Sequence, residues 1–196
     1  MTFRTIDGFV KGLRSIPESE FSRERVLAEF GRTVVDPESL RRYAFCCPTH
    51  YTRNLIYRDE LFEVVALGWE SGQASMIHNH RDQECWMGVP VGRLEVRNFR
   101  LVEYDAAAGT CRLAPSTRYE IDPTHAAAVD PGEPIHSVHN LESFGARAIS
   151  LHVYSKPIDS CMVYQLEAGR CFEVALEYTS RQGLLCPGET AAAVPV

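Results

Sequence analysis

Apolar residues in the first 47 positions recur at the three- and four-residue spacing of amphipathic helices. Two groups show this spacing: Ile6, Phe9, Val10 and Leu13, and then Val26, Leu27 and Phe30. Asp36 followed by Pro37 adds a capping residue and a suitable first helical position. We therefore expect residues 1–47 to form an N-terminal helical segment.

After Tyr51 the pattern changes to short runs rich in β-branched and aromatic residues, separated by turn residues. The clearest runs cover residues 62–69, 86–104, 148–155 and 171–178. Their spacing predicts a β-sandwich or barrel over residues 48–186. Residues 105–134, rich in Ala, Thr, Pro and Asp, are expected to form turns and short edge strands, and residues 187–196 a loose tail.

Composition indicates one domain that binds a small molecule. The chain has 196 residues, of which 45% are apolar and 23% charged, and its formal net charge is −6. Because the basic residues are scattered, neither nucleic acid nor an acidic membrane is an expected partner. The N-terminal residues lack the apolar core and small-residue cleavage site typical of a signal peptide, and no apolar run approaches the length needed to span a bilayer. We expect a cytoplasmic monomer.

Cysteine usage argues against a disulfide framework and against a structural zinc site. The seven cysteines are odd in number, irregularly spaced and without a Cys-x-x-Cys pair. They are expected to be reduced thiols, mostly in the core: Cys46, Cys47, Cys85, Cys111, Cys161, Cys171 and Cys186.

His78 and His80 form half of a candidate metal site. They are two positions apart, so on a strand both imidazoles would lie on one face. The pair alone is weak evidence, but the spacing of its neighbours matches the first cupin motif: Gly72, Cys85 in place of the usual glutamate, and Gly92. His136, four residues before Asn140, matches the second cupin motif. We assign His78, His80 and His136 as the ligands.

Other residues could take part in such a site. Glu84 would be a ligand in a variant of the motif with shorter spacing, and His139 could replace His136, although the spacing to Asn140 favours His136. His50 and His125 are interpreted as surface or loop residues. Three neutral ligands would leave the 2+ charge of the metal uncompensated, which favours an anionic ligand such as a thiolate.

The run 148–155 has one apolar and one polar face. Ile149, Leu151 and Val153 alternate with the polar residues Ser150, His152 and Tyr154. A solvent-exposed strand would explain the polar face. We favour the alternative, a hydrogen-bonded chain in which His152 holds the Tyr154 hydroxyl near the metal.

Five segments, in order and in separation, resemble the cysteine dioxygenase family of cupin thiol dioxygenases. They are YTRNL (51–55), HNHRDQEC (78–85), HSVHN (136–140), SLHVYSKPIDSC (150–161) and EVALEYTSRQG (173–183). The resemblance covers the chain from about residue 43 onward. It implies a cupin fold, a double-stranded β-helix or jelly-roll barrel, behind the N-terminal helical layer.

The resemblance also implies residue roles. His78, His80 and His136 match the family's iron ligands, and Arg53, beside Tyr51, matches the arginine that binds the substrate carboxylate. The residues Ser150, His152 and Tyr154 match its outer-shell triad, and Cys85 with Tyr154 matches the pair that forms a thioether crosslink.

The activity implied is oxidation of L-cysteine by O2 to cysteine sulfinic acid at one Fe(II) per chain, without an organic cofactor. Two departures leave the substrate open. Lys156 stands where the family has a proline that would favour a cis peptide after Ser155, and it adds a charge. Related 3-mercaptopropionate dioxygenases have glutamine in place of Arg53, so Arg53 favours cysteine. A dioxygenase for 3-mercaptopropionate or another small thiol, and a metal-binding cupin without catalysis, are the alternatives.

Overall fold

The computed structural model describes residues 2–81 and 83–194. Its helices are α1 (Ile6–Arg14), α2 (Arg23–Arg32) and three 3-10 helices (Glu18–Glu20, Pro37–Tyr43 and Glu142–Phe144). Thr5 and Ser22 cap α1 and α2 with their side-chain oxygens. Asp36 also acts as a cap, as predicted, but the helix that follows it is of the 3-10 type.

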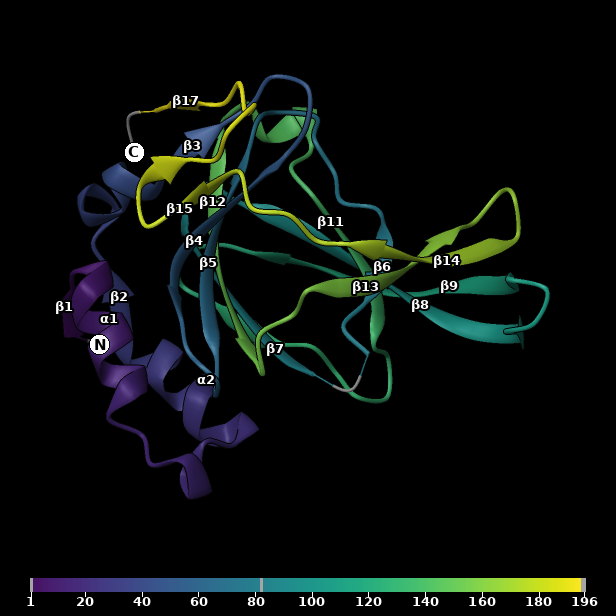
Figure 1. Ribbon diagram of the computed structural model, residues 1–196, viewed down its shortest axis with the longest axis horizontal. Coiled ribbons are helices and arrows are strands. Elements are labelled where there is room, and N and C mark those ends of the chain that lie inside the picture. The colour runs from purple at the N-terminus through teal and green to yellow at the C-terminus, as the bar shows by residue number, and fades with distance from the viewer. Residues whose placement is uncertain (1, 82, 195–196) are drawn as a thin grey trace.

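A seven-stranded sheet forms the centre of the molecule (Figure 1). Its strands, in spatial order, are β10 (Ala126–Ala128), β7 (Glu84–Val91), β12 (Ala148–Ser155), β5 (Glu63–Trp69), β4 (Thr52–Arg58), β15 (Ser180–Arg181) and β16 (Leu184–Leu185). Short pairs flank it: β1 (Thr2–Arg4) with β2 (Thr33–Val35), and β3 (Phe45–Cys46) with β17 (Ala192–Ala193). The predicted loose tail thus contains strand β17.

A second sheet faces the first and closes on itself. Around this barrel the order is β11 (Ile135–His139), β6 (Ile77–Asn79), β13 (Ser160–Gln165), β14 (Arg170–Ala175), β9 (Thr110–Ile121) and β8 (Leu94–Asp105). The hairpins β8–β9 and β13–β14 project away from the helices (Figure 1).

Strand β5 shows why the central sheet is buried on both faces. Its residues Val64 and Ala66 pack with the N-terminal helices, whereas Val65, Leu67 and Trp69 pack between the two sheets. Such a strand reads as a continuous apolar run rather than as a polar–apolar alternation. The mainly β fold with an N-terminal helical layer is therefore confirmed, and the two facing sheets form the jelly roll expected of a cupin.

The structure differs from expectation in residues 86–121. The predicted run 86–104 is broken at Gly92, which adopts φ 77°. Any other residue at this position would place its Cβ atom 2.6 Å from the Arg147 carbonyl oxygen. Strand β9 then pairs with β8 in a long hairpin where turns and short edge strands were expected, because Asp105 accepts backbone hydrogen bonds that close its turn. Over the described residues, no helix is long and apolar enough to cross a membrane.

Candidate metal centre and ligand cavities

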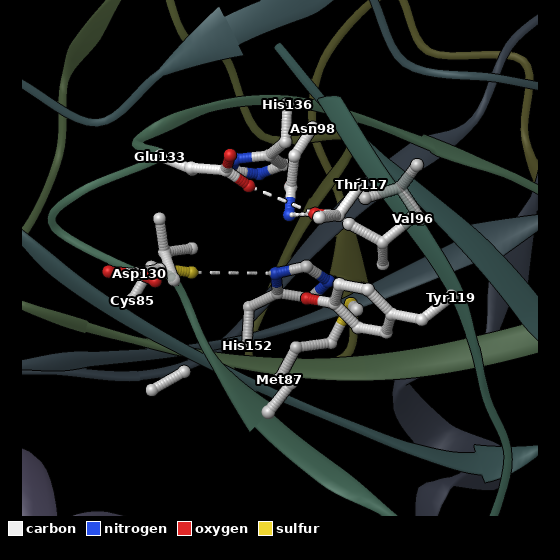
Figure 2. Close-up of a pocket in the computed structure, with 14 residues that line it drawn as sticks. Cys85, Met87, Val96, Asn98, Thr117, Tyr119, Asp130, Glu133, His136 and His152 are labelled. Carbon is white, nitrogen blue, oxygen red and sulfur yellow. Dashed lines mark hydrogen bonds between the residues drawn. The ribbon is translucent and has the colours of Figure 1, made fainter. Parts of the chain in front are cut away.

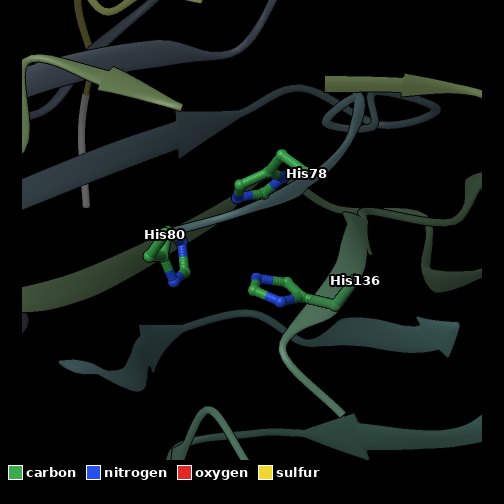
Figure 3. Close-up of side chains that lie close together, drawn as sticks. All are labelled: His78, His80 and His136. Carbon is green, nitrogen blue, oxygen red and sulfur yellow. The ribbon is translucent and has the colours of Figure 1, made fainter. Parts of the chain in front are cut away.

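The side chains of His78, His80 and His136 converge between the two sheets (Figure 3). His78 lies on β6 directly opposite His136 on β11, and His80 follows β6. The ring centroids are 5.0, 4.6 and 4.9 Å apart, and one potential ligand atom from each ring lies within 4.8 Å of the others. This separation suits three ligands around one ion.

Hydrogen bonds orient two of the three rings. The Nδ1 atoms of His78 and His136 lie 2.8 Å from the Met76 carbonyl oxygen and 3.3 Å from that of Pro134. A carbonyl only accepts, so each Nδ1 carries the proton and each Nε2 keeps its lone pair for a metal.

His80 completes the fit to a metal. Its Nδ1 atom is buried and has no hydrogen-bond partner among residues 2–81 and 83–194. Burial lowers the pKa of His78, and it lowers the pKa of both His80 and His136 well below its ordinary value. Three neutral imidazoles with one unsatisfied buried nitrogen fit a divalent transition metal.

The alternative ligands face elsewhere. The Glu84 carboxylate forms an ion pair with Arg23 at 2.5 Å. His139, three residues after His136 on β11, lies on the opposite face of that strand and contacts the Ser137 hydroxyl at 2.8 Å. The structure therefore brings together His78, His80 and His136, and neither alternative residue joins them.

The polar face of β12 is buried and turned toward these histidines, which excludes the solvent-exposed strand. Trp69 Nε1 donates to Ser150 Oγ at 2.9 Å, so the Ser150 hydroxyl is free to donate to His152 Nε2, also at 2.9 Å. Burial, together with the charge of Arg53, lowers the pKa of His152 to about 3, so its ring is neutral. His152 Nδ1 then carries the proton and faces the Tyr154 oxygen at 3.4 Å.

The hydrogen bonds from Trp69 through Ser150 and His152 to Tyr154 all donate in the same direction. Trp69 has only a donor, and each later group accepts on one side and donates on the other. Because the Tyr154 oxygen accepts from His152, its own hydroxyl proton is free to donate to a ligand. Trp69 was missed in the sequence as a functional residue because its contact with Ser150 joins residues 81 positions apart, and its place at the end of the apolar run 62–69 gave no sign of that contact.

Arg53 on β4 is a buried cation with free donors. Its side chain is 9% exposed, and its guanidinium lies 5.6 and 5.7 Å from the ring centroids of Tyr154 and Tyr178. Its Nε and Nη2 atoms have no hydrogen-bond partner within the described part of the chain. Nearly all buried donors in proteins are satisfied, so these two indicate an anionic ligand. Tyr51 stacks on Trp69 nearby, with centroids 4.6 Å apart.

Cys85 and Tyr154 lie directly opposite each other in the β7–β12 pair. Both are buried, and the Cys85 sulfur is 3.9 Å from His152 Nδ1. Burial raises the pKa of the Cys85 thiol, so it is neutral. The Ser155–Lys156 peptide that follows is cis although Lys156 is not proline, and the Lys156 side chain is exposed.

Two cavities meet at this centre. A small one, about 30 Å³, is lined by Tyr51, Arg53, Trp69, Tyr154 and the three histidines, among others. A larger one, about 250 Å³, lies on the other side of His136 and His152 and extends past Met87 and Tyr119 (Figure 2). Of these two cavities, Arg53 lines the small one.

The sequence is similar to those of known proteins over most of its length. A family model described as cysteine dioxygenase type I matches residues 18–167. The chain is 26% identical to cysteine dioxygenase type 1 of Danio rerio over 187 residues, 94% of this chain and 91% of the relative. It is 25% identical to that of Homo sapiens over 193 residues, 97% and 94% of the two chains.

Solved structures with similar folds include TT1209 from Thermus thermophilus and KdgF from Halomonas sp. The first has a TM-score of 0.45 at 23% identity and covers 60% of this chain and 95% of its own. The second has a TM-score of 0.43 at 16% identity and covers 59% and 89%.

Proposed function

Because the chain belongs to the cysteine dioxygenase type I family, we propose that it oxidises L-cysteine with O2 to cysteine sulfinic acid at a mononuclear Fe(II) centre. The observation that carries this proposal is the unsatisfied guanidinium edge of Arg53 beside three convergent histidines. A small thiol that also carries a carboxylate would satisfy both groups at once.

His78, His80 and His136 would hold the iron, one ion per chain, and no organic cofactor is proposed. When bound, iron supplies the redox chemistry that activates O2 and lowers the pKa of the substrate thiol. The three neutral imidazoles add no negative charge, so an anionic thiolate is favoured over a neutral donor.

Arg53 would bind the substrate carboxylate through its Nε and Nη2 donors, a side-on edge suited to bidentate contact. Tyr51, stacked on Trp69, would form the adjacent wall of the small cavity. The anchor and the histidines line the same cavity, so they would hold the substrate at both ends and fix its sulfur at the iron.

Tyr154 would donate its hydroxyl proton to the substrate or to dioxygen, with His152 and Ser150 holding its orientation. The family's thioether crosslink would join Cys85 to the Tyr154 ring. Their opposed register and shared burial support that bond, which would lock the ring and remove an oxidisable thiol near the metal.

Both L-cysteine and 3-mercaptopropionate carry a carboxylate, and cysteine is favoured because related 3-mercaptopropionate dioxygenases have glutamine in place of Arg53. Two further proposals concern the oligomeric state and the location of the protein. The protein is proposed to act as a monomer, and in the cytoplasm, where its seven free cysteines would remain reduced.

The test is anaerobic loading with Fe(II), followed by O2 uptake and sulfinate detection with L-cysteine and 3-mercaptopropionate in parallel. We expect one O2 consumed per sulfinate formed, with a higher kcat/KM for L-cysteine. Preference for the thiol without an amine would assign the sister activity. An iron-loaded protein that takes up no O2 with either thiol would instead be a non-catalytic metal-binding cupin.

A further inference from the structure

Glu63 is a fully buried carboxylate that the proposed reaction does not use. It begins β5 between Tyr154 on β12 and Arg58 on β4, its two cross-strand neighbours, and its exposed fraction is 0%. Its Oε1 atom lies 3.8 Å from Arg53 Nη2. A buried guanidinium is costly without a counter-charge, so Glu63 offsets the charge of Arg53.

Glu63 stops just short of hydrogen bonding to Arg53. At 3.8 Å the contact is longer than a hydrogen bond, and Arg53 Nη2 has no hydrogen-bond partner among the described residues. Other donors hold the carboxylate: the Tyr178 hydroxyl donates to Oε2, and the Ile158 amide lies 3.4 Å from Oε1. The counter-charge is thus near Arg53 without occupying its donors.

Arg58 fixes the direction of the Tyr178 hydroxyl. Its Nη1 atom donates to the Tyr178 oxygen at 2.9 Å, while a bidentate pair with Asp159, at 2.8 and 2.9 Å, holds the guanidinium. The Tyr178 oxygen therefore accepts from Arg58, and its proton must go to Glu63. Tyr178 thus donates to Oε2, which also lies 3.6 Å from Arg58 Nη1, and not to Oε1, the carboxylate oxygen that faces Arg53.

We propose that Tyr178 is a positioning residue that restrains Glu63, so that the Nε and Nη2 donors of Arg53 stay free for the carboxylate of a substrate. Without the Tyr178 hydroxyl, Glu63 turns to Arg53, completes a direct salt bridge and competes with the substrate. The inference rests on the proposed function only in that Arg53 binds a carboxylate.

The test is Tyr178→Phe, with and without Glu63→Gln, measured with L-cysteine and with cysteamine, which has no carboxylate. In Tyr178→Phe the KM for L-cysteine rises about tenfold, the effect of one charged competitor hydrogen bond, while kcat changes less than about twofold. Cysteamine kinetics do not change. Adding Glu63→Gln restores the KM for L-cysteine, because a neutral amide is a weaker competitor.

Glu63→Gln alone separates competition from orientation. Because Tyr178 already restrains Glu63 in the wild type, this variant does not raise the KM for L-cysteine; a higher KM would mean that Glu63 orients Arg53, and would overturn the proposal. This arm stands even if Tyr178→Phe does not fold. Tyr57→Phe is the matched control, because the Tyr57 hydroxyl donates to the Asp59 carboxylate at 2.6 Å on the surface. An equal loss with cysteamine, or no rescue by Glu63→Gln, would also overturn it.

A second readout needs no metal. Binding of L-alanine, a carboxylate without a thiol, to the metal-free protein is followed by NMR titration. Tyr178→Phe weakens binding about tenfold, and the double variant restores it. If Arg53→Gln abolishes binding but Tyr178→Phe does not change it, the inference about Tyr178 is wrong and the carboxylate anchor at Arg53 stands. If Arg53→Gln leaves binding intact, the proposed carboxylate anchor fails.

Discussion

The two cavities on either side of His136 and His152 differ in size and in how their polar groups are satisfied. The larger cavity holds about 250 Å³, the smaller about 30 Å³. In the larger, Asn98 donates to Thr117 and Thr117 to Glu133, both at 2.9 Å. Among the described residues, none that lines it has a buried side-chain polar atom without a partner.

The smaller cavity contains the unsatisfied groups. Arg53 and His80 both line it, and both keep buried nitrogen atoms without partners in the described part of the chain. Buried donors left open cost stability unless a ligand satisfies them. Open hydrogen-bonding capacity, rather than volume, therefore distinguishes the cavity proposed to bind the substrate.

The largest effect is expected at the wall that the two cavities share. His136→Ala removes one of three proposed ligands and should lower iron affinity by more than about 100-fold, since loss of even an outer partner of a ligand costs about 10- to 100-fold. Metal content after anaerobic loading and desalting, with O2 uptake, measures this. His139→Ala is the control. If His136→Ala retains iron and full activity, His136 is not a metal ligand.

Arg53→Gln tests the small cavity alone. Loss of a charge-assisted contact of a few kcal/mol should raise the KM for L-cysteine about 100-fold. Cysteamine, which lacks the carboxylate, should be affected far less. Steady-state kinetics with both thiols measures the difference, and equal losses with both would show that Arg53 supports the fold rather than the substrate.

The buried imidazole of His152 should make stability depend on pH in the metal-free protein. Its folded pKa of about 3 lies below its ordinary value, so between about pH 6.5 and 3 the unfolded chain binds a proton that the folded chain does not. Stability is therefore lost as pH falls, by about 1.4 kcal/mol per pH unit for this one group.

Urea unfolding of the wild type and His152→Gln at pH 7 and pH 5 measures this loss. The wild type should lose about 2 kcal/mol more than the variant over that interval. His125→Gln, at an exposed position, should behave as the wild type. Equal losses in the wild type and His152→Gln would contradict the burial of a neutral His152.

The smallest effect is expected from filling the larger cavity. Ala127→Leu adds three carbon atoms there and should change kcat/KM for L-cysteine by less than about twofold, because the cavity has room and no anchor. The matched change in the smaller cavity, Leu176→Phe, should lower kcat/KM more than about tenfold. The opposite ranking would assign the substrate to the larger cavity.

Much of the fold was predictable from periodicity. The helical spacing from Ile6 to Leu13 and the apolar runs of β5 and β12 mark elements that the core fixes on one or both faces. Strand β9 was missed, although most of β8 lies in the predicted run 86–104, because residues 115–120 of β9 are exposed and no burial imposes an apolar alternation on them. Turn-forming residues at Asp105–Gly109 then resembled a longer loop.

Two parts of the candidate site were predictable from local spacing: the pair His78 and His80, two positions apart, and the alternating polar residues of β12. What the sequence could not give is the contact between distant elements. Glu63 lies near Arg53 only because β4 and β5 pair, and Tyr178 reaches it from 115 residues away. An acidic residue in a buried apolar run was the single local signal for Glu63.

The most direct test of the central claim is a crystal structure of the Fe(II)-loaded protein grown anaerobically with L-cysteine. We predict that cysteine lies in the small cavity, with its carboxylate on Nε and Nη2 of Arg53 and its sulfur at an ion held by His78, His80 and His136. Cysteine in the larger cavity, or with its carboxylate away from Arg53, would contradict the account.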